Sequence, residues 1–224
     1  MLRLLLKAMR PKQWAKNVFV LAGLFFDARV FEPRPLLRSV IAFAGFCLAS
    51  SAVYLINDLV DLENDRLHPV KRLRPLASGA LPPLAAIVAA GVILAVTIPG
   101  AFLLDTTFGS ALVVYVALMV LYSFVLKKIV IIDVMTVAAG FVLRVFAGAT
   151  VVQVARFSPW LYVCTTLLAL FIAINKRRHE LTLLADSANQ HRPSLDEYNL
   201  PFLDDMSSLV TSTPLVSYCF YTFS

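Results

Sequence analysis

The stretch Asn57-Asp58-Leu59-Val60-Asp61-Leu62-Glu63-Asn64-Asp65 directly follows an uncharged apolar run from Ser39 to Ile56. That run is close to the length of about 20 apolar residues that a helix needs to span a lipid bilayer. If the stretch after it is helical too, Asn57, Asp61 and Asp65 recur every four residues and Asp58 lies seven before Asp65, so all four share one face. The sequence therefore predicts a cluster of acidic groups at the end of a membrane helix.

Carboxylates crowded in this way repel one another unless a cation lies between them. Hard oxygen ligands of this kind suit Mg²⁺ that bridges to phosphate oxygens. We interpret the stretch as a site for magnesium and a diphosphate group, with Asp58, Asp61 and Asp65 as metal ligands and Asn57 as a further catalytic residue. The alternative is a solvated helix end with ordinary surface carboxylates.

The composition indicates a membrane protein. Of 224 residues, 59% are hydrophobic and 15% are charged, whereas roughly 25% are charged in a soluble domain. The uncharged stretches of spanning length are Ser39 to Ile56, Leu76 to Leu104, Thr106 to Leu126 and Phe157 to Asn175. Two stretches with a few charges are also candidate spans, Asn17 to about Val30 and Ile129 to Val152, and another begins near Met206.

From these stretches we expect an all-α, polytopic transmembrane helical bundle. It would form a single integral membrane domain over residues 1–224, with an N-terminal interfacial segment over residues 1–16. About six complete spans would be followed by the start of a seventh. Oligomeric state stays open, a homo-oligomer included.

Lysine and arginine placement predicts the orientation, because short basic loops stay on the cytoplasmic side. The basic loops at residues 66–74, 127–128 and 176–178 follow the second, fourth and sixth expected spans, so they share a side with the basic N-terminus. We expect a bacterial cytoplasmic membrane with the site facing the cytoplasm. The net charge of +6 suits lipid headgroups and phosphate ligands at that face, and we expect no nucleic acid partner.

The polar side chains near this face are candidates for phosphate binding, although the basic ones could serve topology alone. The candidates are Lys16, Asn17, Arg66, Lys71, Arg72, Arg74, Tyr122, Lys127, Lys176 and Arg177. Asp133, Arg144 and Glu180 stay open as site residues. Asp133 and Arg144 would lie roughly 16 Å apart along one helix, so we expect no direct pair between them and expect Arg144 to fix helix packing. Gly140, Ala147 and Gly148 would permit close helix approach.

The acidic stretch, followed by His68-Pro69-Val70-Lys71-Arg72-Leu73-Arg74-Pro75, resembles the first aspartate-rich motif, NDxxDxxxD, of the UbiA superfamily of intramembrane prenyltransferases. Four further segments narrow the resemblance to the decaprenyl-phosphate phosphoribosyltransferase branch. They are Arg10-Pro11-Lys12-Gln13-Trp14-Ala15-Lys16-Asn17, Leu121-Tyr122-Ser123 with Lys127-Lys128, Ile132-Asp133-Val134 with Gly140-Phe141-Val142-Leu143-Arg144, and Asn175-Lys176-Arg177-Arg178-His179-Glu180-Leu181. The resemblance extends to about Leu184, and family members are longer, so we expect the chain to be shortened at its C-terminus.

The resemblance implies a Mg²⁺-dependent transferase. Its substrates would be phosphoribosyl pyrophosphate and a polyprenyl phosphate of the decaprenyl type, and it would transfer 5-phosphoribose to the lipid with release of pyrophosphate. Two departures set the chain apart from a generic family member, and the second of them favours phosphoribosyl transfer because added cations suit a substrate with additional phosphates. Leu126 stands where the Tyr-xxx-Lys lysine of many aromatic prenyltransferases would fall, and the second aspartate-rich cluster is replaced by basic residues before Glu180.

Three alternatives remain open. The chain could be an aromatic-acceptor prenyltransferase of the same superfamily that uses a prenyl diphosphate. It could also be a non-catalytic lipid carrier or transporter, or a binding subunit without activity.

Overall fold

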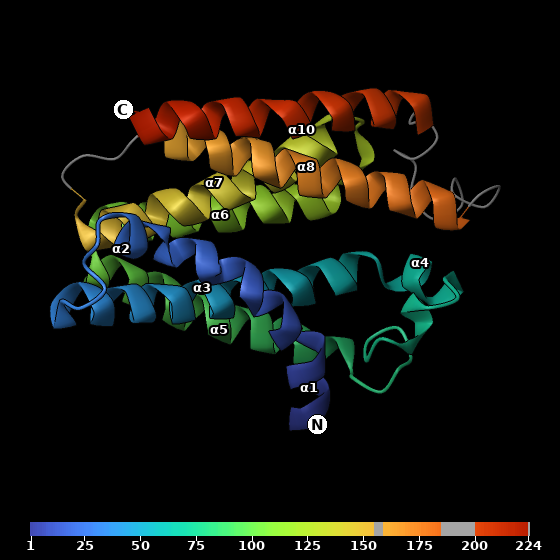
Figure 1. The fold of residues 1–224 in the computed structure, drawn as a ribbon. Coiled ribbons are helices and arrows are strands. Elements are labelled where there is room, and N and C mark those ends of the chain that lie inside the picture. The colour runs from blue at the N-terminus through green and yellow to red at the C-terminus, as the bar shows by residue number, and fades with distance from the viewer. Residues whose placement is uncertain (155–158, 185–199, 224) are drawn as a thin grey trace. The chain divides into compact units, whose positions relative to one another are not determined.

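The computed structural model describes residues 1–154, 159–184 and 200–223. Within these ranges every regular element is a helix (Figure 1), which confirms the expected all-α class. The chain divides into two compact units. The first unit is Met1–Phe124 with Leu143–Val154, and the second is Val125–Val142 with Ala155–Ser224. The expectation of a single membrane domain stays a prediction.

Five helices in the described ranges are long and apolar enough to cross a membrane. A helix is the favoured form for such segments because it satisfies its own backbone polar groups in lipid. The five are α3 (Pro33–Val60), α5 (Pro83–Leu104), α6 (Thr106–Phe124), α7 (Ile132–Val152) and the part Pro159–His179 of α8 (Pro159–Leu184). They coincide with five of the expected spans, so the chain is a multi-pass membrane protein.

The first expected span, Asn17 to about Val30, differs from the prediction. It is not one α-helix: the 3₁₀ helix η1 (Pro11–Leu21) is followed by the short α2 (Ala22–Phe26), after α1 (Leu2–Ala8). The backbone here packs directly against α7, since a Cβ added at Gly148 would lie 1.8 Å from the carbonyl oxygen of Val20. The expected close approach at the small residues of α7 is therefore confirmed at Gly148.

The core of the first unit lies among α3, α5, α6 and the second half of α7. Phe46 of α3 lies at its centre, with ring centroids 5.9 Å from Phe108 and 5.2 Å from Tyr115 of α6. A second cluster fixes the chain after the acidic stretch: Leu76 and Leu81 are fully buried together with Leu55 of α3. This cluster holds the loop before α5 against α3.

The second unit is built on α8 and α10 (Leu200–Phe223), which run side by side in Figure 1. Its core contains Val134 of α7, Ile174 of α8 and Leu203 of α10. Trp160 and Phe220 stack with ring centroids 5.0 Å apart. The last helix begins at Leu200, before the expected start near Met206, and Pro201 in its first turn is compatible with a helix start.

Candidate functional site

The acidic stretch lies where α3 ends and the short helix α4 (Leu62–Leu67) begins, with Asp61 between them. Helical backbone hydrogen bonds continue across this junction: the N–H of Asp61 donates to the carbonyl of Asn57 at 3.0 Å, and the N–H of Asp65 donates to that of Asp61 at 2.8 Å. The helical register on which the prediction of a shared face depends is therefore present.

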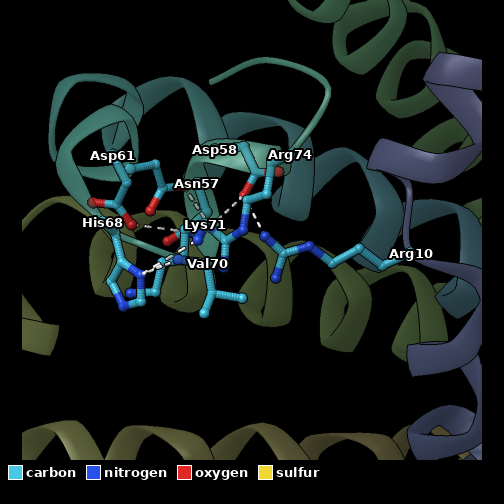
Figure 2. Close-up of polar contacts among 9 residues, drawn as sticks. Arg10, Asn57, Asp58, Asp61, His68, Val70, Lys71 and Arg74 are labelled. Carbon is cyan, nitrogen blue, oxygen red and sulfur yellow. Dashed lines mark hydrogen bonds and ion pairs between the residues drawn. The ribbon is translucent and has the colours of Figure 1, made fainter. Parts of the chain in front are cut away.

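Asp58 and Asp65 are buried and both pair with Arg74. Asp58 and Arg74 are labelled in Figure 2. The Nη1 atom of Arg74 lies 2.5 Å from Oδ2 of Asp65 and 3.2 Å from Oδ1 of Asp58. Arg10 forms a second ion pair with the same Oδ1 of Asp58. A buried carboxylate is costly without a compensating charge, and the two arginines supply it here.

Asn57 and Asp61 form a neighbouring pair on the half-buried side of the junction. The amide Nδ2 of Asn57 donates to Oδ2 of Asp61 at 3.1 Å. His68 shapes the turn that follows, because its Nδ1 accepts the backbone N–H of Val70 at 3.1 Å and that of Lys71 at 3.3 Å. This turn leads into the 3₁₀ helix η2 (Lys71–Leu73), which carries the basic residues toward the acidic stretch.

Arg10 is the site residue that sequence reasoning missed. It joins α1 to η1 with the left-handed backbone angles φ 54° and ψ 61°, a conformation uncommon for a residue other than glycine. Its guanidinium carbon lies 5.0 Å from the ring centroid of Tyr54. The one local signal was its position in the N-terminal segment that carried the family resemblance, because its partner Asp58 lies 48 residues later.

Asn17, expected as a phosphate ligand, lies in a buried polar network of the first unit. Its side chain has no exposed surface. Its amide nitrogen donates to Ser50 Oγ at 3.1 Å, and its Oδ1 accepts from Nε of Arg144 at 2.9 Å. Arg144 also donates to the hydroxyl of Tyr115 at 2.8 Å. The network favours a packing role for Arg144, as expected, and for Asn17 as well.

Lys16 precedes this network in η1 and is exposed. Although the residue as a whole is exposed, protein packed around the ammonium keeps water from it, which lowers the pKa of Lys16 below its ordinary value, and the positive charges of Arg144 and Arg10 lower it further. No carboxylate of the described residues forms an ion pair with Lys16. An ammonium in such surroundings favours an anion as its partner.

The other candidates of the first unit differ in exposure. Arg66 is exposed and donates to Glu63 Oε1 at 2.8 Å, so it lies in an ordinary surface pair. Arg72 is exposed, whereas Lys71 and Tyr122 are half-buried. Lys71 belongs to the turn at His68, because its backbone N–H donates to Nδ1 of His68, and it is drawn beside the acidic stretch in Figure 2.

In the second unit, Asp133 of α7 and Arg177 of α8 form a buried ion pair, with Nε and Oδ2 2.7 Å apart. This pair was not expected, since both residues were candidates for ligand contacts. Lys127 is half-buried in the 3₁₀ helix η3 (Leu126–Lys128), and Lys176 is exposed. The side chain of Glu180 lies outside the described part of the structure.

The acidic stretch offers carboxylate oxygens, the type of ligand that Mg²⁺ takes from proteins. Over residues 1–154, 159–184 and 200–223 no group of three or more His, Cys, Asp or Glu side chains is arranged to hold a metal. However, Mg²⁺ is commonly bound by one or two carboxylates together with substrate phosphates. Asp58 and Asp65 supply two neighbouring carboxylates of this kind, and their oxygens pair with Arg74 and Arg10 in this structure.

Comparison with known proteins gives one consistent family. The UbiA prenyltransferase family matches residues 17–195. Two relatives named decaprenyl-phosphate phosphoribosyltransferase are similar over 98% of this chain: the protein of Corynebacterium glutamicum, 37% identical over 67% of its own length, and that of Mycolicibacterium smegmatis, 34% identical over 70%.

A solved structure shares the fold. The UbiA homolog of Archaeoglobus fulgidus bound to GPP and Mg²⁺ superposes with a TM-score of 0.80 over 97% of this chain and 77% of its own, at 20% sequence identity. This chain belongs to the UbiA prenyltransferase family.

Proposed function

We propose that this chain transfers 5-phosphoribose from phosphoribosyl pyrophosphate to a polyprenyl phosphate of the decaprenyl type and releases pyrophosphate. The observation that carries the proposal is the set of relatives with the phosphoribosyltransferase name, which are 34–37% identical over almost the whole chain. The acidic stretch and the basic residues around it supply the charges that such a reaction needs.

In this reaction an oxygen of the lipid phosphate attacks the anomeric carbon of the ribose. The bond from that carbon to the pyrophosphate oxygen breaks, and the pyrophosphate leaves with the bonding electrons. A phosphomonoester has its second pKa near about 6, so the attacking group is already anionic at neutral pH. The protein therefore needs to position and neutralise anions rather than to remove a proton.

For the leaving group we assign the acidic stretch and the loop after it. Mg²⁺ held by Asp58, Asp65 and the adjacent Asp61 would neutralise charge on the departing pyrophosphate. Lys71 and Arg74 reach the same region from η2 and its C-terminal end. Both can donate to phosphate oxygens, and Arg74 can do so with two parallel N–H groups.

For the lipid phosphate we assign Lys16 first, since its ammonium is partly desolvated and faces other cations. Lys127 and Lys176 stay candidates from the sequence alone. Asn17 and Arg144 would act through packing, because their hydrogen bonds hold η1 and therefore the backbone next to Lys16. Arg66 and Arg72 remain candidates for the outer phosphate groups.

We further propose that the site faces the cytoplasm of a bacterial cell from its inner membrane, on the strength of the basic loops. The arrangement is compatible with a monomer or a homo-oligomer, because the acidic stretch and both of its arginine partners come from one chain.

The test is an assay of purified protein in detergent with phosphoribosyl pyrophosphate labelled in the ribose, decaprenyl phosphate and Mg²⁺. We expect labelled lipid and an equal amount of pyrophosphate. Activity in detergent, where no transmembrane gradient exists, would also exclude a role limited to transport. An absence of labelled lipid, combined with activity on a prenyl diphosphate and an aromatic acceptor, would replace the proposal by the aromatic prenyltransferase alternative.

A further inference from the structure

The buried carboxylates of the acidic stretch already have cationic partners from within the chain. Arg74 contacts both Asp58 and Asp65, and Arg10 contacts Asp58 from the joint between α1 and η1 (Figure 2). Only 2% of the Asp58 side chain and 4% of the Asp65 side chain are exposed. Water therefore does little to stabilise the two negative charges, and the arginines carry that task.

These contacts conflict with metal binding at the same carboxylates. Both arginines use Oδ1 of Asp58, and Arg74 uses Oδ2 of Asp65. A divalent ion bound to these oxygens would lie within a few ångströms of two guanidinium charges, and repulsion between like charges at that distance is strong where water is scarce. The metal and the arginines can share the site only if the arginines move.

The structure also indicates where the arginines have an alternative partner. The Arg10 and Arg74 side chains are 26% and 27% exposed, so an anion from solvent can reach both guanidinium groups. An anion beside these two cations would relieve their repulsion. Arg74 directly follows η2 and is half-buried. Because Leu76 fixes the following loop in the core, the side chain of Arg74 can turn without displacement of that loop.

We propose that Arg10 and Arg74 are resident counter-ions of the acidic stretch that the metal displaces, and that the displaced guanidinium groups then hold substrate phosphates. The second half of this inference rests on the proposed function, whereas the first half does not. The exchange couples metal binding to phosphate binding, because each release of an arginine from a carboxylate provides a cation for the anionic substrate.

The test measures binding of Mn²⁺, as a paramagnetic probe for the Mg²⁺ site, by electron paramagnetic resonance on purified protein without substrate. The variants are Arg74→Met and Arg10→Met, whose new side chain has neither charge nor oxygen. A charge-assisted hydrogen bond corresponds to roughly a factor of ten or more in affinity, so each variant should bind Mn²⁺ about tenfold more tightly than the natural protein. Both should also show a larger increase in melting temperature on addition of Mg²⁺.

Arg178→Met is the matched control. Arg178 pairs with Asp204 at the same 2.5 Å N–O distance as Arg74 with Asp65, but the side chains of Arg178 and Asp204 are both about half exposed. This variant should bind Mn²⁺ as the natural protein does. Unchanged or weaker Mn²⁺ binding in both Arg10→Met and Arg74→Met would overturn the proposal.

A further measurement covers the case in which Arg74→Met does not fold. In the natural protein, Mg²⁺ alone should speed hydrogen exchange of the guanidinium N–H groups of Arg74, whose Nη1 donates to Asp58 and Asp65 when no metal is bound. Bound Mn²⁺ with unchanged exchange there would also count against displacement. Because no substrate is present, these results do not depend on phosphoribosyl transfer. If the protein transfers phosphoribose but its metal binding does not depend on the arginines, the displacement of arginine by metal is refuted and the proposed function is not.

Discussion

Replacement of Asp133 by asparagine tests whether the buried ion pair of Asp133 with Arg177 stabilises the fold of the second unit. Asp133 has no exposed side-chain surface, and Oδ2 lies 2.7 Å from Nε of Arg177, of which 2% is exposed. Asparagine keeps the size of the side chain but removes the negative charge beside the guanidinium. Loss of one partner from a buried ion pair typically costs about 3–5 kcal/mol, so Asp133→Asn should reduce the free energy of unfolding by about 3 kcal/mol.

The next arginine in the chain provides an internal comparison. Arg178 pairs with Asp204 at 2.5 Å, with 45% and 51% of the two side chains exposed. An exposed pair typically contributes about 0.2–1 kcal/mol. Asp204→Asn should therefore cost much less than Asp133→Asn, although the two ion pairs have similar N–O distances.

The assay is reversible unfolding in mixed detergent micelles, followed by circular dichroism, on both single variants and on Asp133→Asn combined with Arg177→Met. Replacement of both partners by uncharged groups should recover much of the loss, because no buried charge is then left. If Asp133→Asn costs no more than Asp204→Asn, the pair does not stabilise the fold. Arg177 would then be better explained as the ligand contact expected from the sequence.

Three further outcomes are expected. Gly148→Ala should destabilise the first unit by about 1–3 kcal/mol, the usual range for overpacking, because its Cβ would lie 1.8 Å from the Val20 carbonyl oxygen. Gly91→Ala is the control, since nothing lies within 4 Å of a Cβ added there. Equal melting temperatures of the two variants would contradict the packing at Gly148. Asp58→Asn should abolish Mg²⁺-dependent transfer in the labelled-lipid assay while the protein remains folded, and a normal rate would remove Asp58 from the site. In the folded protein the pKa of Lys16 is lowered, mainly by burial, below its ordinary value of 10.5. The unfolded chain therefore binds the proton more tightly, so the free energy of unfolding should rise with pH until pH 10.5 is reached. In Lys16→Met this rise should become smaller in pH-dependent unfolding, and an identical pH profile would show that the lysine is not desolvated.

Local patterns were sufficient for much of the fold. The spans from Ser39, Leu76 and Thr106 were predicted from uncharged length alone, because a long apolar segment in lipid has to satisfy its backbone within itself. The helical register of Asn57, Asp61 and Asp65 depends on hydrogen bonds between residues four apart, which are also local. The segment from Asn17 to Val30 was less predictable, since its winding accompanies direct backbone packing against Gly148.

The site also contains residues that local spacing predicts and residues whose partners only the folded structure shows. The acidic stretch could be identified because four polar groups recur at helical spacing after a membrane span. The partner of each charge could not: Arg10 reaches Asp58 across 48 positions, Arg177 reaches Asp133 across 44, and Arg144 reaches Asn17 across 127. Nothing in the spacing of a basic residue shows whether it will meet a carboxylate, an amide or a substrate.

The sequence by itself determined that this is a helical membrane protein of the UbiA family with an acidic stretch at the end of α3, because span length, helical period and motif are properties of neighbouring residues. The tertiary structure decided which cations neutralise that stretch and which are used for packing. The physical reason is that a buried charge takes the counter-charge that folding brings nearest, and that distance is set by the packing of helices far apart in the chain.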